Sequence, residues 1–174
     1  MPHHQGALDG LCGVYSIVNS ISIVRAEQGR EPKELFDAII EHLSEKRHLK
    51  QIITSGMTIG VLYNIINDLI TEEIPRRRPF VGKDVSLPMV WDEMLGHLES
   101  PSTGIGAVII GLNGKHNHWT VVTRIQGDTL FLTDSDGLKR LSRKKITIGE
   151  PTSRRIHQIR SEERRVGKEC RSRW

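Results

Sequence analysis

The sequence predicts an α+β fold in which an N-terminal helical half is followed by a C-terminal antiparallel β-sheet. In residues 12–98, apolar residues recur at intervals of three and four, which is the period of helices buried on one face. From residue 107 onward, short runs rich in β-branched residues alternate with turn sequences such as Asn113-Gly114. The chain of 174 residues is long enough to bury a core without a disulfide or a metal.

Four segments of the first half carry helical patterns. Each has an apolar stripe, and most begin at a residue type that favours a helix start, either proline at the first position or a capping hydroxyl. The predicted helices are residues 12–26, a helix beginning near Pro32, residues 58–69 capped by Thr58 or Ser55, and residues 88–98 capped by Ser86.

The second half reads as consecutive hairpins. Turn sequences at residues 113–114, 126–128 and 134–137 separate the β-rich runs, so neighbouring strands are expected to pair antiparallel. The predicted strands are residues 107–112, 118–125 and 129–133, with weaker candidates at 138–141, 145–148 and 154–159.

We expect residues 1–160 to form one domain. Residues 161–174 have neither a helical nor a strand period and carry five basic and three acidic residues. This segment is predicted to be a disordered basic tail, and it resembles a vector- or assembly-derived end. The alternative is a native tail that contacts nucleic acid. The tail supplies +2 of the net charge of +4, which leaves a nearly neutral body and disfavours a nucleic-acid groove.

The sequence predicts a cytoplasmic protein without membrane association. The longest uncharged run near the N-terminus, residues 11–24, is shorter than the roughly 20 apolar residues of a membrane span. Residues 1–5 do not resemble a secretion signal. The two cysteines, Cys12 and Cys170, provide no disulfide framework, which fits a reducing compartment.

The first candidate for chemistry is Cys12, which stands where the first apolar helix begins. The positive end of the helix dipole lowers the pKa of a thiol and supplies the reactive thiolate. Gly10 and Gly13 are expected to leave room for a substrate backbone beside the sulfur. The alternative is a small buried core cysteine, and this segment alone favours neither interpretation.

A thiolate nucleophile needs a base, and His118 is the candidate. It opens a strand directly after a turn, and Trp119 with the β-branched residues that follow would hold its backbone. His116 is the rival, because it has the same strand parity. A surface histidine beside a turn is the alternative for either residue.

Asp134 is the candidate that would orient the base. It follows the next strand, and eight residues separate both His118 and Asp134 from Gln126, so antiparallel pairing brings them together. Asp136 is the fallback, and a plain turn is the alternative. Gln5 would donate to a developing oxyanion together with the backbone N–H of Cys12, unless it is only a polar residue near the terminus.

Four features together resemble the papain-like cysteine peptidases. They are Gln5, Cys12 at a helix start, His118-Trp119 followed by a valine run, and a strand that ends in Asp134. The match looks closest to the bacteriocin-leader peptidase branch and its stand-alone bacterial relatives. The resemblance implies a helical lobe and a sheet lobe with the site between them. It implies Gln5, Cys12, His118 and Asp134 as the catalytic residues, a peptide or protein substrate, and no metal or cofactor. Leu11 departs from the acidic residue usual before the cysteine of leader peptidases.

Hydrolysis of a peptide or isopeptide bond through a thioester is therefore the predicted activity. Other Cys-His-Asp acyl transferases or deamidases, and a catalytically silent peptide-binding module, are the alternatives. Substrate choice is expected in loops at residues 51–57 and 76–83, and the oligomeric state is not predicted. Weaker alternatives are a metal site from His3, His4, Cys12, His116 and His118, and nucleic-acid binding through Arg76, Arg77, Arg78 and the tail.

Overall fold

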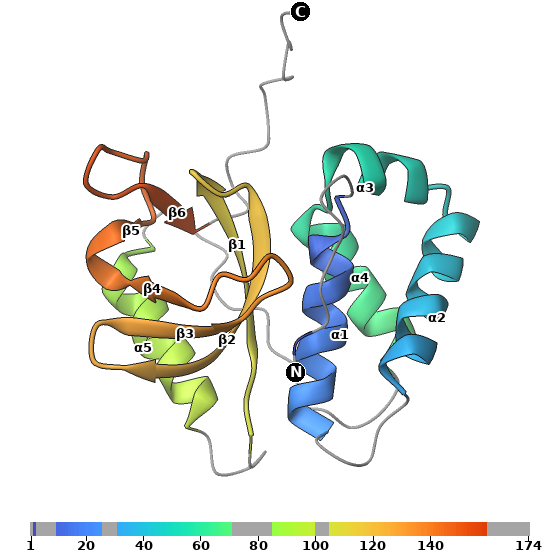
Figure 1. Cartoon of the computed structure of the whole chain (residues 1–174), viewed down its shortest axis with the longest axis horizontal. Helices are drawn as coiled ribbons and strands as arrows, with labels where there is room; N and C mark the ends of the chain where they lie inside the picture. Colours follow the sequence, from blue (N-terminus) through green and yellow to red (C-terminus); the bar gives the residue numbers. More distant parts are fainter. Residues whose placement is uncertain (1, 3–9, 26–30, 71–84, 100–104, 160–174) are drawn as a thin grey trace, which may run out of the picture.

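The computed structural model describes residues 2, 10–25, 31–70, 85–99 and 105–159. Within these residues it has five α-helices and one six-stranded sheet, and all five helices precede the sheet along the chain. Figure 1 shows the first four helices on one side of the molecule and the sheet with the fifth helix on the other. The predicted α+β class, with helices N-terminal and the sheet C-terminal, is confirmed. None of the helices in the described ranges has the length and apolar character that a bilayer crossing demands.

The helices of the first half begin close to where their sequence signals stand. Pro32 occupies the first turn of its helix, and the Thr58 hydroxyl accepts a hydrogen bond from the Val61 N–H at 3.3 Å, which caps the fourth helix. The bounds are α1 (Cys12–Arg25), α2 (Pro32–Glu45), α3 (Leu49–Ser55) and α4 (Ile59–Leu69).

The short helix α3 was not predicted. Residues 51–57 were expected to form a loop, but residues 51–55 belong to this helix and only 56–58 connect it to α4. Its two turns bury a single residue, Ile52, so it carries no apolar period that a sequence pattern could show. The other loop proposed for substrate choice, residues 76–83, lies outside the described residues.

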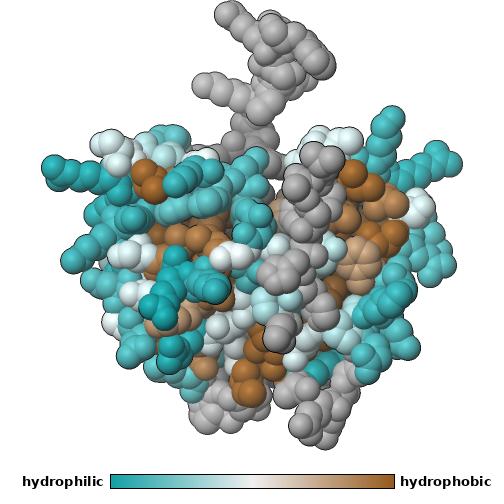
Figure 2. Space-filling model, in the orientation of Figure 1, coloured by the Kyte–Doolittle hydropathy of each residue, from teal (hydrophilic) through white to brown (hydrophobic). Residues whose placement is uncertain are grey.

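Two apolar cores hold the fold together. One lies among α1, α2 and α4, and the other lies between α5 (Leu87–Leu98) and the sheet. The Ser86 hydroxyl caps α5 as predicted, because it accepts from the Met89 N–H at 3.4 Å. On the face shown in Figure 2, hydrophilic side chains cover the outer edges of both halves. Buried members of the first core include Val14, Ile17, Val18, Leu35, Ile39 and Ile65; members of the second include Trp91, Met94, Ile110, Leu112, Val122 and Leu130.

The sheet has the strand order β4-β3-β2-β1-β6-β5. Neighbours from β4 to β6 pair antiparallel, as predicted, whereas β5 runs parallel to β6. The prediction of a wholly antiparallel sheet is therefore wrong at the β5 edge. Residues 148–156 carry the chain around there instead of closing a tight hairpin. The bounds are β1 (Val108–Gly114), β2 (His118–Gln126), β3 (Thr129–Thr133), β4 (Arg140–Ser142), β5 (Ile146–Thr147) and β6 (His157–Ile159), with a short 3₁₀ turn over Arg143–Lys145.

The register of β2 and β3 decides where Asp134 lies. Val121 pairs with Thr133, after an irregularity in β2 between Val122 and Arg124. Continuing this register by one residue brings Asp134 beside Thr120, not directly opposite His118 as equal spacing from the turn had suggested. His118 and Thr120 share one face of β2, so the side chain of Asp134 still reaches the imidazole.

Candidate active site

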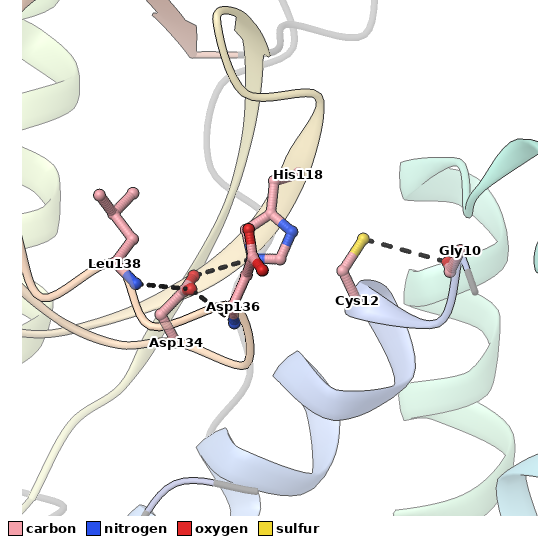
Figure 3. Close-up of polar contacts among 6 residues, drawn as sticks. All are labelled: Gly10, Cys12, His118, Asp134, Asp136 and Leu138. Atoms are coloured by element: carbon pink, nitrogen blue, oxygen red, sulfur yellow. Dashed lines mark hydrogen bonds and ion pairs between the residues drawn. The ribbon is translucent and has the colours of Figure 1, made fainter. Parts of the chain in front are cut away.

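The nucleophile candidate, Cys12, is the first residue of α1. Its side chain is 6% exposed, and its sulfur lies 4.0 Å from the carbonyl oxygen of Gly10. The first N–H groups of a helix have no partner within the helix and form the positive end of its dipole. Figure 3 shows the sulfur at the start of α1, between the carbonyl of Gly10 and the imidazole of His118. The helix thus offers a partly positive environment for a thiolate at this position.

The base candidate, His118, is the first residue of β2 and is buried. Its Nε2 lies 2.8 Å from Oδ2 of Asp134. Because an ionised carboxylate can only accept, Nε2 carries the proton in this contact. The Nδ1 atom is therefore the imidazole nitrogen left to exchange a proton with Cys12.

The carboxylate of Asp134 is itself held by the turn that follows β3. Its Oδ1 accepts from the backbone N–H of Asp136 at 2.8 Å and of Leu138 at 3.0 Å, and Gly137 provides the positive φ of +83° that this turn uses. Asp134 is only 3% exposed. One oxygen is thus fixed by the backbone, and the other is aimed at His118.

Opposing effects set the charge state of these two groups. Burial lowers the pKa of His118, but the hydrogen bonds and negative charges of Asp134 and Cys12 outweigh it and raise the pKa to about 9. Burial raises the pKa of Asp134, but the contact with His118, the Thr120 hydroxyl and the Leu138 N–H lower it overall. A protonated His118 beside an ionised Asp134 is therefore the favoured state near neutral pH.

The two glycines near Cys12 do not have the role expected for them. A Cβ on Gly10 would lie 2.3 Å from the carbonyl oxygen of Ile52, and one on Gly13 would lie 2.9 Å from the sulfur of Met57. The space beside these glycines is filled by α3 and by the connector to α4. The expectation that they leave room for a substrate backbone was therefore wrong.

The rival residues lie elsewhere. His116 stacks on the ring of His157, with centroids 5.1 Å apart, and Asp136 contributes its backbone N–H to the turn that holds Asp134. No group of three or more metal-ligating side chains occurs within the described ranges. Of the predicted site residues, the structure brings together Cys12, His118 and Asp134. The remaining candidates lie outside the described residues. They are the proposed oxyanion donor Gln5, and His3, His4, Cys170, Arg76, Arg77 and Arg78.

Sequence reasoning missed Thr120 as a member of the site. Its side chain is fully buried beside Asp134, whose pKa it helps to lower. Its parity with His118 along β2 was the available signal, but this required the true register of β2 and β3.

Comparison with family models, with curated proteins and with solved structures finds no match to this chain. Function is therefore inferred from the geometry of the site and from the residues that form it.

Proposed function

We propose that the protein is a papain-like cysteine hydrolase that cleaves a peptide or isopeptide bond. The observation that carries this proposal is Cys12 at the start of α1, facing a histidine whose other nitrogen contacts a buried aspartate at 2.8 Å. A nucleophile, a base and an orienting group in that order are what nucleophilic catalysis requires. In this proposal, the helical half and the sheet half are the two lobes of a papain-like fold.

In the first half-reaction, the Cys12 thiolate attacks the carbonyl carbon of the scissile bond. The carbonyl π electrons move to oxygen, and the oxyanion faces the N–H groups at the positive end of α1. Gln5 is the expected second donor. When the tetrahedral adduct collapses, its C–N bond breaks, His118 donates its proton to the leaving amine, and an acyl thioester stays on Cys12.

In the second half-reaction, neutral His118 takes a proton from water while the water oxygen attacks the thioester carbonyl. Collapse of this adduct breaks the C–S bond and releases the carboxylic acid product. The thiolate and the protonated imidazole are restored, with Asp134 holding the same imidazole nitrogen throughout. No cofactor or metal enters this sequence.

The test is the pH dependence of Cys12 alkylation by iodoacetamide, in a protein carrying Cys170→Ser. A thiolate in an ion pair should react at pH values well below the reference thiol pKa of about 8.5, and His118→Ala should shift the profile upward. His116→Ala is the matched control, because this ring stacks on His157 and should leave the profile unchanged. A normal thiol profile in the Cys170→Ser protein without further substitutions would refute the proposal.

A second measurement separates hydrolysis from other acyl transfer. Incubation with peptide esters should produce an acyl adduct on Cys12, visible by intact mass, that decays to the free peptide acid. Glycinamide added as an acceptor should capture little of the acyl group if water is the natural acceptor. Predominant amide formation would instead indicate an acyl transferase, and an activated thiol that never acylates would indicate a peptide-binding module.

A further inference from the structure

A buried hydrogen bond joins the two halves of the molecule directly beside the site. Trp119 follows His118 in β2, and its indole N–H donates to the backbone carbonyl of Met57 at 2.8 Å. The indole is 2% exposed and packs in the helical core, although it belongs to a strand. The residue next to the candidate base is thereby attached to residues 56–58, the connector between α3 and α4.

The same part of the chain also holds both sides of Cys12. The N–H of Gly10 donates to the carbonyl of Ile53 at 2.9 Å, at the end of α3. On the other side of Cys12, Gly13 lies so close to Met57 that a Cβ there would be 3.0 Å from the Met57 Cβ. The end of α3 and the connector thus contact the residues flanking Cys12, while Met57 also accepts from the neighbour of His118.

We propose that Trp119 is a positioning residue that sets the approach of the His118 imidazole to the Cys12 sulfur through its hydrogen bond to Met57. The inference rests on the proposed function, since it concerns how the same Cys-His pair is assembled. Trp119, the neighbour of His118, packs in the same core as Cys12, so this core joins the two sides of the site. Apolar packing has no preferred direction, whereas the hydrogen bond to Met57 restricts both the distance and the angle between the two sides.

The experiment must remove the indole N–H and leave the apolar packing. β-(3-benzothienyl)alanine at position 119 does so, whereas Trp119→Phe also removes part of the buried ring system. Trp91→Phe is the control for that lost volume, because Trp91 is similarly buried, at 3% against 2% exposed, but lies in the core between α5 and the sheet. In Trp119→Phe, we expect the pKa read from Cys12 alkylation to rise by about one unit, so that alkylation slows about tenfold at pH values below the pKa of the parent protein. Trp91→Phe should leave that profile as in the parent protein, even where it lowers the melting temperature.

A background lacking the base separates positioning from general packing. In His118→Ala, adding Trp119→Phe should not change the Cys12 profile further, because Trp119 acts through His118. If Trp119→Phe does not fold, β-(3-benzothienyl)alanine at position 119 keeps the bicycle and replaces only the N–H by sulfur, and the same upward shift is expected.

Each outcome assigns a cause. An activated Cys12 that titrates identically in the parent and in Trp119→Phe would refute the positioning role and leave the proposed function standing. An equal shift in Trp91→Phe, or a further shift in the His118→Ala background, would refute it as well, because the effect would then be one of stability. A normal thiol in the parent protein would refute the proposed function and the inference together.

Discussion

Replacing Asp134 by asparagine tests the candidate site at the group proposed to orient the base. The turn donates two backbone N–H groups, from Asp136 and Leu138, to Oδ1 of this side chain. In Asp134→Asn, the amide oxygen should occupy that position, because an NH₂ group there would face two donors. The amide NH₂ then points at Nε2 of His118 and forces Nε2 to accept. The proton moves to Nδ1, where a neutral imidazole cannot take a proton from Cys12.

The expected effects of Asp134→Asn on the His118 pKa and on turnover follow from the charges involved. The pKa of His118 is about 9 in spite of its burial, and the contact with Asp134 is the leading cause that raises it. Removing an opposite charge at hydrogen-bond distance lowers a histidine pKa by about 1–3 units, which is about 1–4 kcal/mol of lost stabilisation of the imidazolium. A reversed imidazole tautomer costs about 10⁴-fold in turnover in a serine-protease triad, so we expect a loss of about that size.

The assay is an NMR titration of the His118 ring together with the Cys12 alkylation profile. Asp136→Asn is the matched control, because it removes an exposed negative charge two residues away and keeps the backbone N–H that donates to Asp134. A His118 pKa that stays near 9 in Asp134→Asn would refute the assignment of Asp134 as the orienting group. An equal fall in Asp136→Asn would show that general negative charge, not the contact, raises the pKa.

Three further outcomes are expected. Cys12→Ala should reduce turnover by about 10⁶-fold, as loss of a triad nucleophile does, while the protein still unfolds cooperatively in urea; substantial residual cleavage would exclude the thiol as nucleophile. Gly10→Ala should destabilise the fold by about 1–3 kcal/mol in urea unfolding, because its Cβ would meet the Ile52 carbonyl at 2.3 Å, whereas Gly60→Ala, whose Cβ would lie 4.0 Å from the Thr58 hydroxyl, should be neutral or stabilising. Folding lowers the pKa of Asp134, so its carboxylate stabilises the fold above about pH 4, and this stabilisation is lost as pH falls through the pKa of the folded state. In urea unfolding between pH 5 and pH 2, Asp134→Asn should therefore lose less stability than the parent protein.

The elements with a clear apolar period were predictable from the sequence, and so was the pairing of the middle strands. α1 buries Val14, Ile17 and Val18 at helical spacing, and the turn at residues 126–128 joins strands of clear β composition. Strand β5 lies within the candidate at residues 145–148, but its parallel direction was not predicted, because two residues carry no signal for the strand that they pair with. Helix α3 was not predicted, because it is short and buries only Ile52.

The candidate site was predictable as residue types but not as geometry. Cys12 and His118 stand at the first residues of α1 and β2, where a pattern of apolar residues begins, so their element boundaries could be read from the sequence. The glycines at positions 10 and 13 were misinterpreted, because a sequence shows that space is needed but not which atoms fill it. The register beside Thr120 and the hydrogen bond to Met57 depend on tertiary packing, which no local pattern encodes.

The charge state of the pair has a consequence for stability that a neutral thiol would not have. Folding raises the pKa of His118 from 6.5 to about 9, so this group alone stabilises the fold fully below pH 6.5 and loses that effect as pH rises to 9. A thiolate at Cys12 acts oppositely, because a lowered thiol pKa stabilises the fold above about pH 8.5 and loses that effect as pH falls.

The opposing effects of His118 and Cys12 on stability cancel between about pH 6.5 and 8.5. In this window the two groups together hold one proton in the folded state and one in the unfolded state. With a thiolate-imidazolium pair, the free energy of unfolding should therefore be flat across this window and fall on both sides, relative to a Cys12→Ala, His118→Ala double variant. With a neutral thiol beside a protonated imidazole, the same difference should instead fall by about 1.4 kcal/mol per pH unit from pH 6.5 up to the pKa that His118 then has, because the negative charge of Cys12 no longer helps to raise it. Urea unfolding at half-unit pH intervals distinguishes the two slopes, and a steady fall would refute the ion pair on which the proposed chemistry depends.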